Sequence, residues 1–235
     1  MMTLKLKIKN EECPAYFGKM ESLNVYETLI DDNHQCTSAK HFCLKIVATA
    51  KLPTRFGDFK AVAFFQDDDN KEHAAFVKGD IIGKENVLVR MHSECLTGDA
   101  IGSLRCDCRE QLEKALTRIN EEGEGVLIYL RQEGRGIGLT NKLKAYMLQD
   151  GGLNTVDANL ALGFEDDVRD YHLAAHMLKS MKIKSIRLMT NNPKKIEDLE
   201  RHGIIIVERV EHSFPPNVHN EFYLQTKKDL SHHLL

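Results

Sequence analysis

The order of its strand-like and helix-like segments most constrains how this chain can fold. Three early runs are rich in Val, Ile and Phe, as β-strands are: residues 43–50 (CLKIVATA), 58–65 (DFKAVAFF) and 86–91 (NVLVRM). Pro53 and Gly57 mark a turn between the first two runs. The simplest arrangement for these three segments is an antiparallel meander.

Helix-like and strand-like segments alternate along the second half of the chain. Residues 109–120 carry Leu112, Ala115, Leu116 and Ile119 at the spacing of one helical face. After this helix the pattern predicts, in order, a strand at 125–130, a helix ending near 149, a helix near 170–181, a strand at 184–190, a helix at 194–202 and a strand at 203–209. We therefore expect an α/β fold of an α+β-like kind, in which N-terminal antiparallel strands join a mixed sheet flanked by helices.

The balance of charges argues against a nucleic-acid-binding surface. The 235 residues include 32 Lys and Arg against 35 Asp and Glu, for a formal net charge of −3. Because neither sign dominates, bulk electrostatics favours neither nucleic acid nor an anionic membrane as a partner.

No stretch of about 18 apolar residues is present, which predicts no transmembrane helix. We expect a cytoplasmic protein.

Residues 1–42 differ in texture from the rest of the chain. They include an acidic, polar stretch at residues 31–35, show little clean periodicity and lack the apolar segment of a secretory signal. The strand-like runs begin just after Phe42. The sequence therefore predicts an N-terminal extension of unknown role at 1–42 and a folded domain at 43–235.

Three cysteines form the pattern C-x10-C-x-C, at Cys95, Cys106 and Cys108. Thiolates are soft ligands that suit zinc, and zinc prefers four tetrahedral ligands. Three protein ligands would leave the fourth position for a water whose pKa falls to about 7, as in a catalytic site. The spacing alone leaves two other interpretations open, a structural zinc with a fourth ligand such as His92 and reduced cysteines without a metal.

The residues around this array resemble the zinc signature of GTP cyclohydrolase II. The signature runs from Arg90 to Cys108 as R-x-H-S-E-C-L-T-G-D-A-x-x-S-L-R-C-D-C. The resemblance continues in order through RQEGRGIGLTNKLKAYMLQD (131–150), TVDAN (155–159), LGFEDDVRDY (162–171), LMTNNPKK (188–195) and NVHNEFYLQTK (217–227). It covers residues 44–235, roughly four-fifths of the chain, although residues 210–216 depart from the usual family sequence.

The resemblance implies an enzyme that hydrolyses GTP, with 43–235 as its catalytic domain. By similarity, one zinc ion per chain is held by Cys95, Cys106 and Cys108. The implied reaction opens the guanine imidazole ring at C8 and releases formate and diphosphate. The product would be 2,5-diamino-6-ribosylamino-4-pyrimidinone 5′-phosphate, formed in the first step of riboflavin biosynthesis. Mg²⁺ is expected with the GTP phosphates, and a homodimer is the implied assembly.

The resemblance also implies roles for individual residues. Asp167 matches the family's proton acceptor, Arg169 its nucleophile and Tyr146 a tyrosine near the zinc. A milder alternative for Arg169 is that it only neutralises charge on the α-phosphate, because arginine is almost never deprotonated in proteins. The implied contacts with GTP are Arg90, His92, Ser93, Glu94, Gln111, Glu133, Gly134, Arg135, Thr155, Thr190 and Lys195.

Two rival functions are compatible with the same motif. A relative that uses another purine or pyrimidine nucleotide would differ in the guanine and phosphate contacts, which all match here. A binding module with a structural zinc would need a fourth protein ligand and would not turn over GTP. The string from Thr190 to Lys195 also has two interpretations, a phosphate-binding helix N-terminus or a plain capped surface helix.

Overall fold

The structure of the chain is a computed structural model that describes residues 44–66, 71–165, 167–221 and 225. The predicted extension at 1–42 lies outside these residues, so the division of the chain at residue 42 stays a prediction. Within the described part, no helix is both long enough and apolar enough to cross a membrane.

One mixed sheet of seven strands, in the order β1-β2-β3-β5-β4-β6-β7, forms the centre of the described structure. The strands are β1 (Leu44–Thr54), β2 (Gly57–Gln66), β3 (Glu72–Lys78), β4 (Val87–Ser93), β5 (Gly125–Leu130), β6 (Ile186–Met189) and β7 (Ile206–Val210). β1, β2, β3 and β5 pair antiparallel, whereas β5, β4, β6 and β7 pair parallel. An antiparallel half thus joins a parallel half, and the predicted fold class is confirmed.

The predicted meander has the wrong third strand. β3, at Glu72–Lys78, follows β2 as the third antiparallel strand, and the predicted strand at 86–91 lies instead within β4, between β5 and β6. β3 alternates between buried and less buried positions, as a strand with one covered face does. Its buried side chains include the small Ala75 and the polar His73, so the segment lacks a strong apolar signal.

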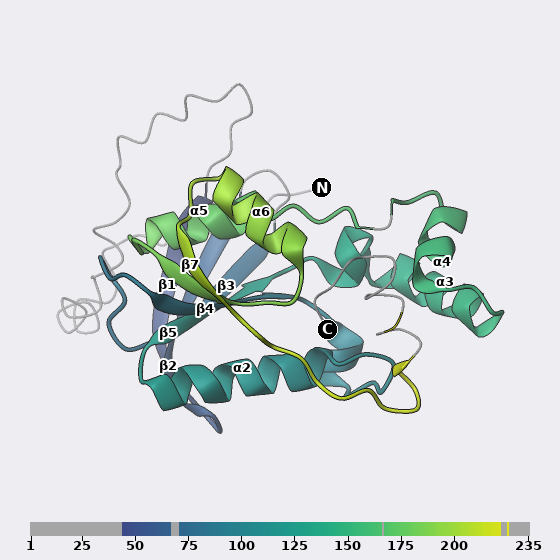
Figure 1. Cartoon of the computed structure of the whole chain (residues 1–235), viewed down its shortest axis with the longest axis horizontal. Helices are drawn as coiled ribbons and strands as arrows, with labels where there is room; N and C mark the ends of the chain where they lie inside the picture. Colours follow the sequence, from purple (N-terminus) through teal and green to yellow (C-terminus); the bar gives the residue numbers. More distant parts are fainter. Residues whose placement is uncertain (1–43, 67–70, 166, 222–224, 226–235) are drawn as a thin grey trace, which may run out of the picture.

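Helices cover both faces of the sheet (Figure 1). They are α2 (Cys108–Glu122), α3 (Gly138–Asp150), α4 (Thr155–Ala161), α5 (His172–Ser180) and α6 (Pro193–Arg201), with short helical turns η3 (Leu96–Ala100) and η4 (Glu133–Gly136). α5 and α6 lie on one face of the sheet and α2 on the other. The predicted helices at 109–120, 170–181 and 194–202 are confirmed to within two residues at each end, whereas α4 and η3 were not predicted.

Neighbouring residues of β4 belong to the two hydrophobic cores on opposite faces of the sheet. Leu88 packs in a cluster with Ile119 of α2, and Val89 packs in a cluster with Leu178 of α5. Successive side chains of a strand point to opposite faces, so a stretch of strand that is covered by apolar cores on both sides favours an uninterrupted apolar run. This double burial explains the unbroken run from Val87 to Val89.

The carboxyl ends of the central parallel strands lead into the predicted site. The chain leaves β4 into η3, which follows Cys95, and leaves β5 into η4 at Glu133–Gly136. α3 and α4 contact each other beyond this end of the sheet (Figure 1). Ligands of α/β sheets bind outside the carboxyl ends of parallel strands, so the fold brings the residues of the motif to the place where a ligand site is expected.

Candidate active site

The three predicted zinc ligands lie together at the start of η3 and of α2. The sulfur atoms of Cys95, Cys106 and Cys108 all lie within 4.8 Å of one another, and Cys95 and Cys106 are buried. The Sγ atoms of Cys95 and Cys106 are 3.7 Å apart. Two sulfurs on a tetrahedral zinc with bonds of about 2.3 Å would be roughly 3.8 Å apart, so the donor set and its spacing suit this ion.

Gly98 provides the space in which the sulfurs approach each other. A Cβ atom at this position would lie 2.8 Å from Cys106 Sγ and 3.0 Å from Cys95 Sγ. Its backbone N–H lies 3.4 Å from Cys95 Sγ and donates to it. Both features require the backbone at residue 98 to pass directly beside the cysteine cluster, which only a glycine permits.

Protons are shared unequally among the three thiols. Hydrogen bonds from the Cys106 and Cys108 side chains lower the pKa of Cys95, and the charge of Lys142 acts in the same direction. The pKa of Cys108 is raised well above its usual value by its hydrogen bonds to Cys106 and Cys95 and by burial. A divalent cation would replace these shared protons, because thiolates rather than thiols bind metals.

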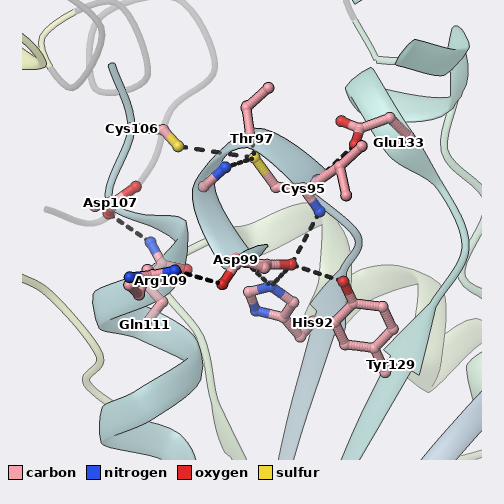
Figure 2. A network of polar contacts seen from close by, with 12 residues as sticks. His92, Cys95, Thr97, Asp99, Cys106, Asp107, Arg109, Gln111, Tyr129 and Glu133 are labelled. Carbon is pink, nitrogen blue, oxygen red and sulfur yellow. Dashed lines mark hydrogen bonds and ion pairs between the residues drawn. The ribbon is translucent and has the colours of Figure 1, made fainter. Parts of the chain in front are cut away.

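Asp99 anchors the backbone of Cys95 from below (Figure 2). Its Oδ2 atom accepts the backbone N–H of Cys95 at 3.0 Å and the hydroxyl of Tyr129 at 2.8 Å. His92 Nε2 lies 3.0 Å from both carboxylate oxygens of Asp99. His92 is therefore directed to a carboxylate, and it is not among the described residues whose ligand atoms form the metal-binding group. The structure does not support His92 as a fourth zinc ligand.

A second chain of hydrogen bonds holds the segment between Cys106 and Cys108. Gln111 Nε2 donates to Asp107 Oδ2 at 2.5 Å, and Arg90 donates to Gln111 Oε1. Arg90 is buried and also donates to the carbonyl oxygen of Met189 at 2.8 Å. Burial lowers the pKa of Arg90 to about 10. Both polar chains of contacts thus fix the backbone that presents the cysteines.

One cavity opens beside the cysteine cluster. The predicted site residues that line it are Ser93, Glu94, Cys95, Cys106, Cys108, Glu133, Gly134, Arg135, Tyr146, Thr155 and Arg169. Polar residues with no predicted role also line it, namely Arg105, Gln132, Lys142, Gln149 and Asn159. The cavity therefore combines soft metal ligands with arginine side chains, a combination suited to a metal-assisted reaction on an anionic substrate.

Tyr146 projects from α3 into this cavity. The Cζ atom of Arg105 lies 4.7 Å from the centre of the Tyr146 ring, and burial raises the pKa of the Tyr146 hydroxyl to about 12. The phenol is therefore protonated at neutral pH and available as a hydrogen-bond donor. Arg105 also forms an ion pair with Asp150 at the end of the same helix.

The remaining predicted residues do not line this cavity. Lys195 is buried and its Nζ atom donates to the carbonyl oxygen of Met91 at 2.8 Å. The hydroxyl of Thr190 accepts the backbone N–H of Asn192 at 3.1 Å, and Asn192 caps α6 by accepting from Lys194 at 3.0 Å. The predicted residues outside the lining are Arg90, His92, Gln111, Asp167, Thr190 and Lys195.

Comparison with known proteins decides the family. Residues 45–211 match the family model described as GTP cyclohydrolase II. The chain belongs to the GTP cyclohydrolase II family. The predicted membership and the predicted enzyme class are both confirmed.

Curated GTP cyclohydrolase II proteins resemble this chain over nearly their full length. The GTP cyclohydrolase-2 of Aeromonas hydrophila is 56% identical over 80% of this chain and 96% of that protein. The GTP cyclohydrolase-2 of Salmonella typhimurium is 58% identical over 82% and 98%, respectively. That of Picrophilus torridus is 52% identical over 81% and 99%.

Sequence reasoning missed several residues of this GTP cyclohydrolase II site. Asp99 lies inside the recognised signature but received no role, and Lys142 lies inside the segment 131–150. An Asp in a short helical turn and a Lys on a helix are ordinary surface residues by type. The signal that distinguishes them is burial against the cysteine cluster, which depends on the fold.

Proposed function

We propose that this chain is a zinc-dependent hydrolase that opens the imidazole ring of GTP at C8. It would release formate and diphosphate and form 2,5-diamino-6-ribosylamino-4-pyrimidinone 5′-phosphate, the first step of riboflavin biosynthesis. The observation that carries the proposal is the group of three cysteine sulfurs within 4.8 Å of one another, in the wall of a cavity that also holds Arg135 and Arg169.

Cys95, Cys106 and Cys108 would hold the zinc ion. With three protein ligands, zinc keeps a fourth position open and can supply a nucleophile at neutral pH by lowering the pKa of water there to about 7. Mg²⁺ would be bound chiefly by the phosphates of GTP, as is common for nucleotide substrates. The proposed chemistry therefore depends on the cysteines at one end of the cavity.

The chain's own residues would orient the nucleotide. Glu133 lies beside the cysteine loop and can accept a hydrogen bond from a guanine N–H donor. The Tyr146 hydroxyl, protonated at neutral pH, can donate a hydrogen bond to an acceptor atom of the bound nucleotide or of the attacking water. Arg135 and Arg169 supply positive charge for the phosphates, since guanidinium groups match phosphate geometry.

Other parts of the prediction rest on the family resemblance. Ser93, Glu94, Gly134 and Thr155 line the cavity, which supports contacts with GTP. As contacts with GTP, Arg90, His92, Gln111, Thr190 and Lys195 stay predictions. A homodimer and a location in the cytoplasm also stay predictions.

Turnover tests this proposal directly. Purified protein is mixed with GTP, Mg²⁺ and zinc, and formate and diphosphate are measured in parallel. We expect equal amounts of the two products, loss of both after chelation of zinc, and recovery when zinc is added back. Cys106→Ser should abolish both products, whereas Cys13→Ser, a cysteine outside the described residues and outside the array, should leave them unchanged.

The pattern of products separates the proposal from its rivals. Diphosphate without formate would show phosphate-bond hydrolysis without ring opening. Neither product from zinc-loaded protein would overturn the proposed function.

A further inference from the structure

The ammonium group of Lys142 donates hydrogen bonds to two segments of the site, the cysteine loop (Cys95 and η3) and η4. It is buried on α3, one helical turn before Tyr146. Its Nζ atom lies 2.8 Å from Glu133 Oε1, 2.9 Å from Thr97 Oγ1 and 3.1 Å from Cys95 Sγ. An ammonium group has three N–H donors, so each donor has one acceptor. A buried lysine with this many matched acceptors is held in one position.

Glu133 also contacts the cysteine loop directly. Its Oε2 atom accepts the backbone N–H of Leu96 at 2.6 Å, and its Oε1 atom accepts that of Gly134 at 2.9 Å in addition to Lys142. A carboxylate offers about four lone-pair sites. Three described N–H groups thus occupy three of them, which leaves one for a guanine donor. The carboxylate therefore acts mainly as a link between η4 and the residue after Cys95.

We propose that Lys142 is a positioning residue that joins the proposed zinc ligand Cys95 to Glu133 of η4, the segment proposed to contact GTP and called here the nucleotide loop. The inference rests on the proposed function, because it assigns Lys142 a role toward the zinc centre. Three thiolates and a divalent zinc ion carry a net charge of minus one, and the ammonium group of Lys142 balances it. A hydrogen bond from Lys142 also withdraws electron density from the sulfur of Cys95, which preserves the Lewis acidity of the bound ion.

The same contacts couple metal binding to the nucleotide loop. A change in the position of Cys95 Sγ moves the acceptor of Lys142, and Lys142 in turn holds Glu133. Partners in the second layer around a metal typically change metal affinity by about 10–100-fold when they are removed. Lys142 should therefore affect the metal centre even when no nucleotide is bound.

Cobalt spectroscopy tests the inference without measuring turnover. Zinc is exchanged for Co²⁺, and the thiolate-to-cobalt charge-transfer absorption is recorded for the full chain. In Lys142→Met the sulfur of Cys95 loses its charged donor and keeps the backbone N–H of Gly98. We therefore expect this absorption to move to longer wavelength and Co²⁺ to bind at least about tenfold more weakly. Lys142→Gln, which keeps an N–H donor but no charge, should shift the absorption in the same direction by a smaller amount.

Lys144→Met is the matched control, because Lys144 is exposed on the same helix. It should leave both the absorption and the affinity unchanged, and thermal unfolding confirms that each variant is folded. Folded Lys142 variants with the absorption and Co²⁺ affinity of the wild type would overturn the inference alone. A wild-type protein with no thiolate-to-cobalt absorption would overturn the proposed zinc centre itself and the inference with it.

Discussion

Arg169 donates two parallel hydrogen bonds to Asp167, from Nε to Oδ1 at 2.8 Å and from an η nitrogen to Oδ2 at 2.5 Å. Burial acts to raise the pKa of Asp167, but these bonds and the charge of Arg169 outweigh it and lower the pKa to about 2. A carboxylate with so low a pKa is a poor acceptor for the proton of a guanidinium group, whose pKa exceeds about 12. The pair therefore favours the milder alternative, in which Arg169 would be a fixed positive charge that neutralises the α-phosphate, over Arg169 as a nucleophile.

The first prediction follows from this fixed charge. Arg169→Ala should lower the rate of diphosphate release by about 10²–10³-fold, because a positioned donor to developing charge is lost. Arg169→Lys keeps the charge but loses the paired geometry, so its rate should fall between wild type and Arg169→Ala. Arg201→Ala is the control, since Arg201 is exposed and pairs with Asp198 away from the cavity. Mass spectrometry of protein quenched during turnover checks the alternative role. A nucleotide adduct on Arg169 would show that Arg169 is the nucleophile.

The second prediction concerns the space at Gly98. In Gly98→Ala the new methyl group would lie 2.8 Å from Cys106 Sγ, so either the sulfurs or the η3 backbone must shift. We expect zinc affinity to fall at least about tenfold, measured by competition with a chromophoric chelator. Ala100→Ser adds an atom at an exposed position of the same turn and should bind zinc as the wild type does. Zinc affinity in Gly98→Ala equal to that of the wild type would contradict the close approach at residue 98.

The third prediction concerns the carboxylate of Asp99. Asp99→Asn leaves one amide oxygen to receive the donors of Cys95, His92 and Tyr129, and it turns an NH₂ group toward them. Such a loss should lower the free energy of unfolding by about 1–3 kcal/mol, measured by chemical denaturation. Asp80→Asn, at an exposed position, should change it little. Equal destabilisation by both variants would show that Asp99 has no special role in holding Cys95.

The strands and helices could be predicted where their apolar periodicity is strong, and the family motif predicted most of the residues that line the cavity, but not the contacts that hold them in place. β5 and α2 follow their sequence patterns closely because both bury apolar side chains in the cores. The family motif brought the cysteines, Glu133 and Arg169 into one prediction. The contact between Lys142 and Cys95 joins residues 47 positions apart, and that between His212 and Gln111 joins residues 101 positions apart. Pairings of this kind are decided by how the elements pack, which no local pattern encodes.

His212 connects residues 210–216, where the chain departs from the family sequence, to the start of α2. Its Nε2 atom lies 2.8 Å from the carbonyl oxygen of Gln111, which makes Nε2 the donor of a neutral ring. Nδ1 is buried with no hydrogen-bond partner among the described residues. Burial first, and then the charge of Arg90, lower the pKa of His212 to about 3. Protonation would place an unpaired charge beside another cation.

This lowered pKa predicts a loss of stability on acidification. An unfolded chain protonates histidine near pH 6.5 and the folded chain only near pH 3, so between these values the unfolded state binds more protons. Stability should therefore decrease as the pH falls, by about 2 kcal/mol from roughly pH 7 to pH 5 for this group. His212→Gln retains an N–H donor for Gln111 but does not titrate. From roughly pH 7 to pH 5 its free energy of unfolding should therefore fall by about 2 kcal/mol less than that of the wild type. His219→Gln, at an exposed position, should keep the wild-type dependence, and an equal slope in all three proteins would show that His212 is not held neutral.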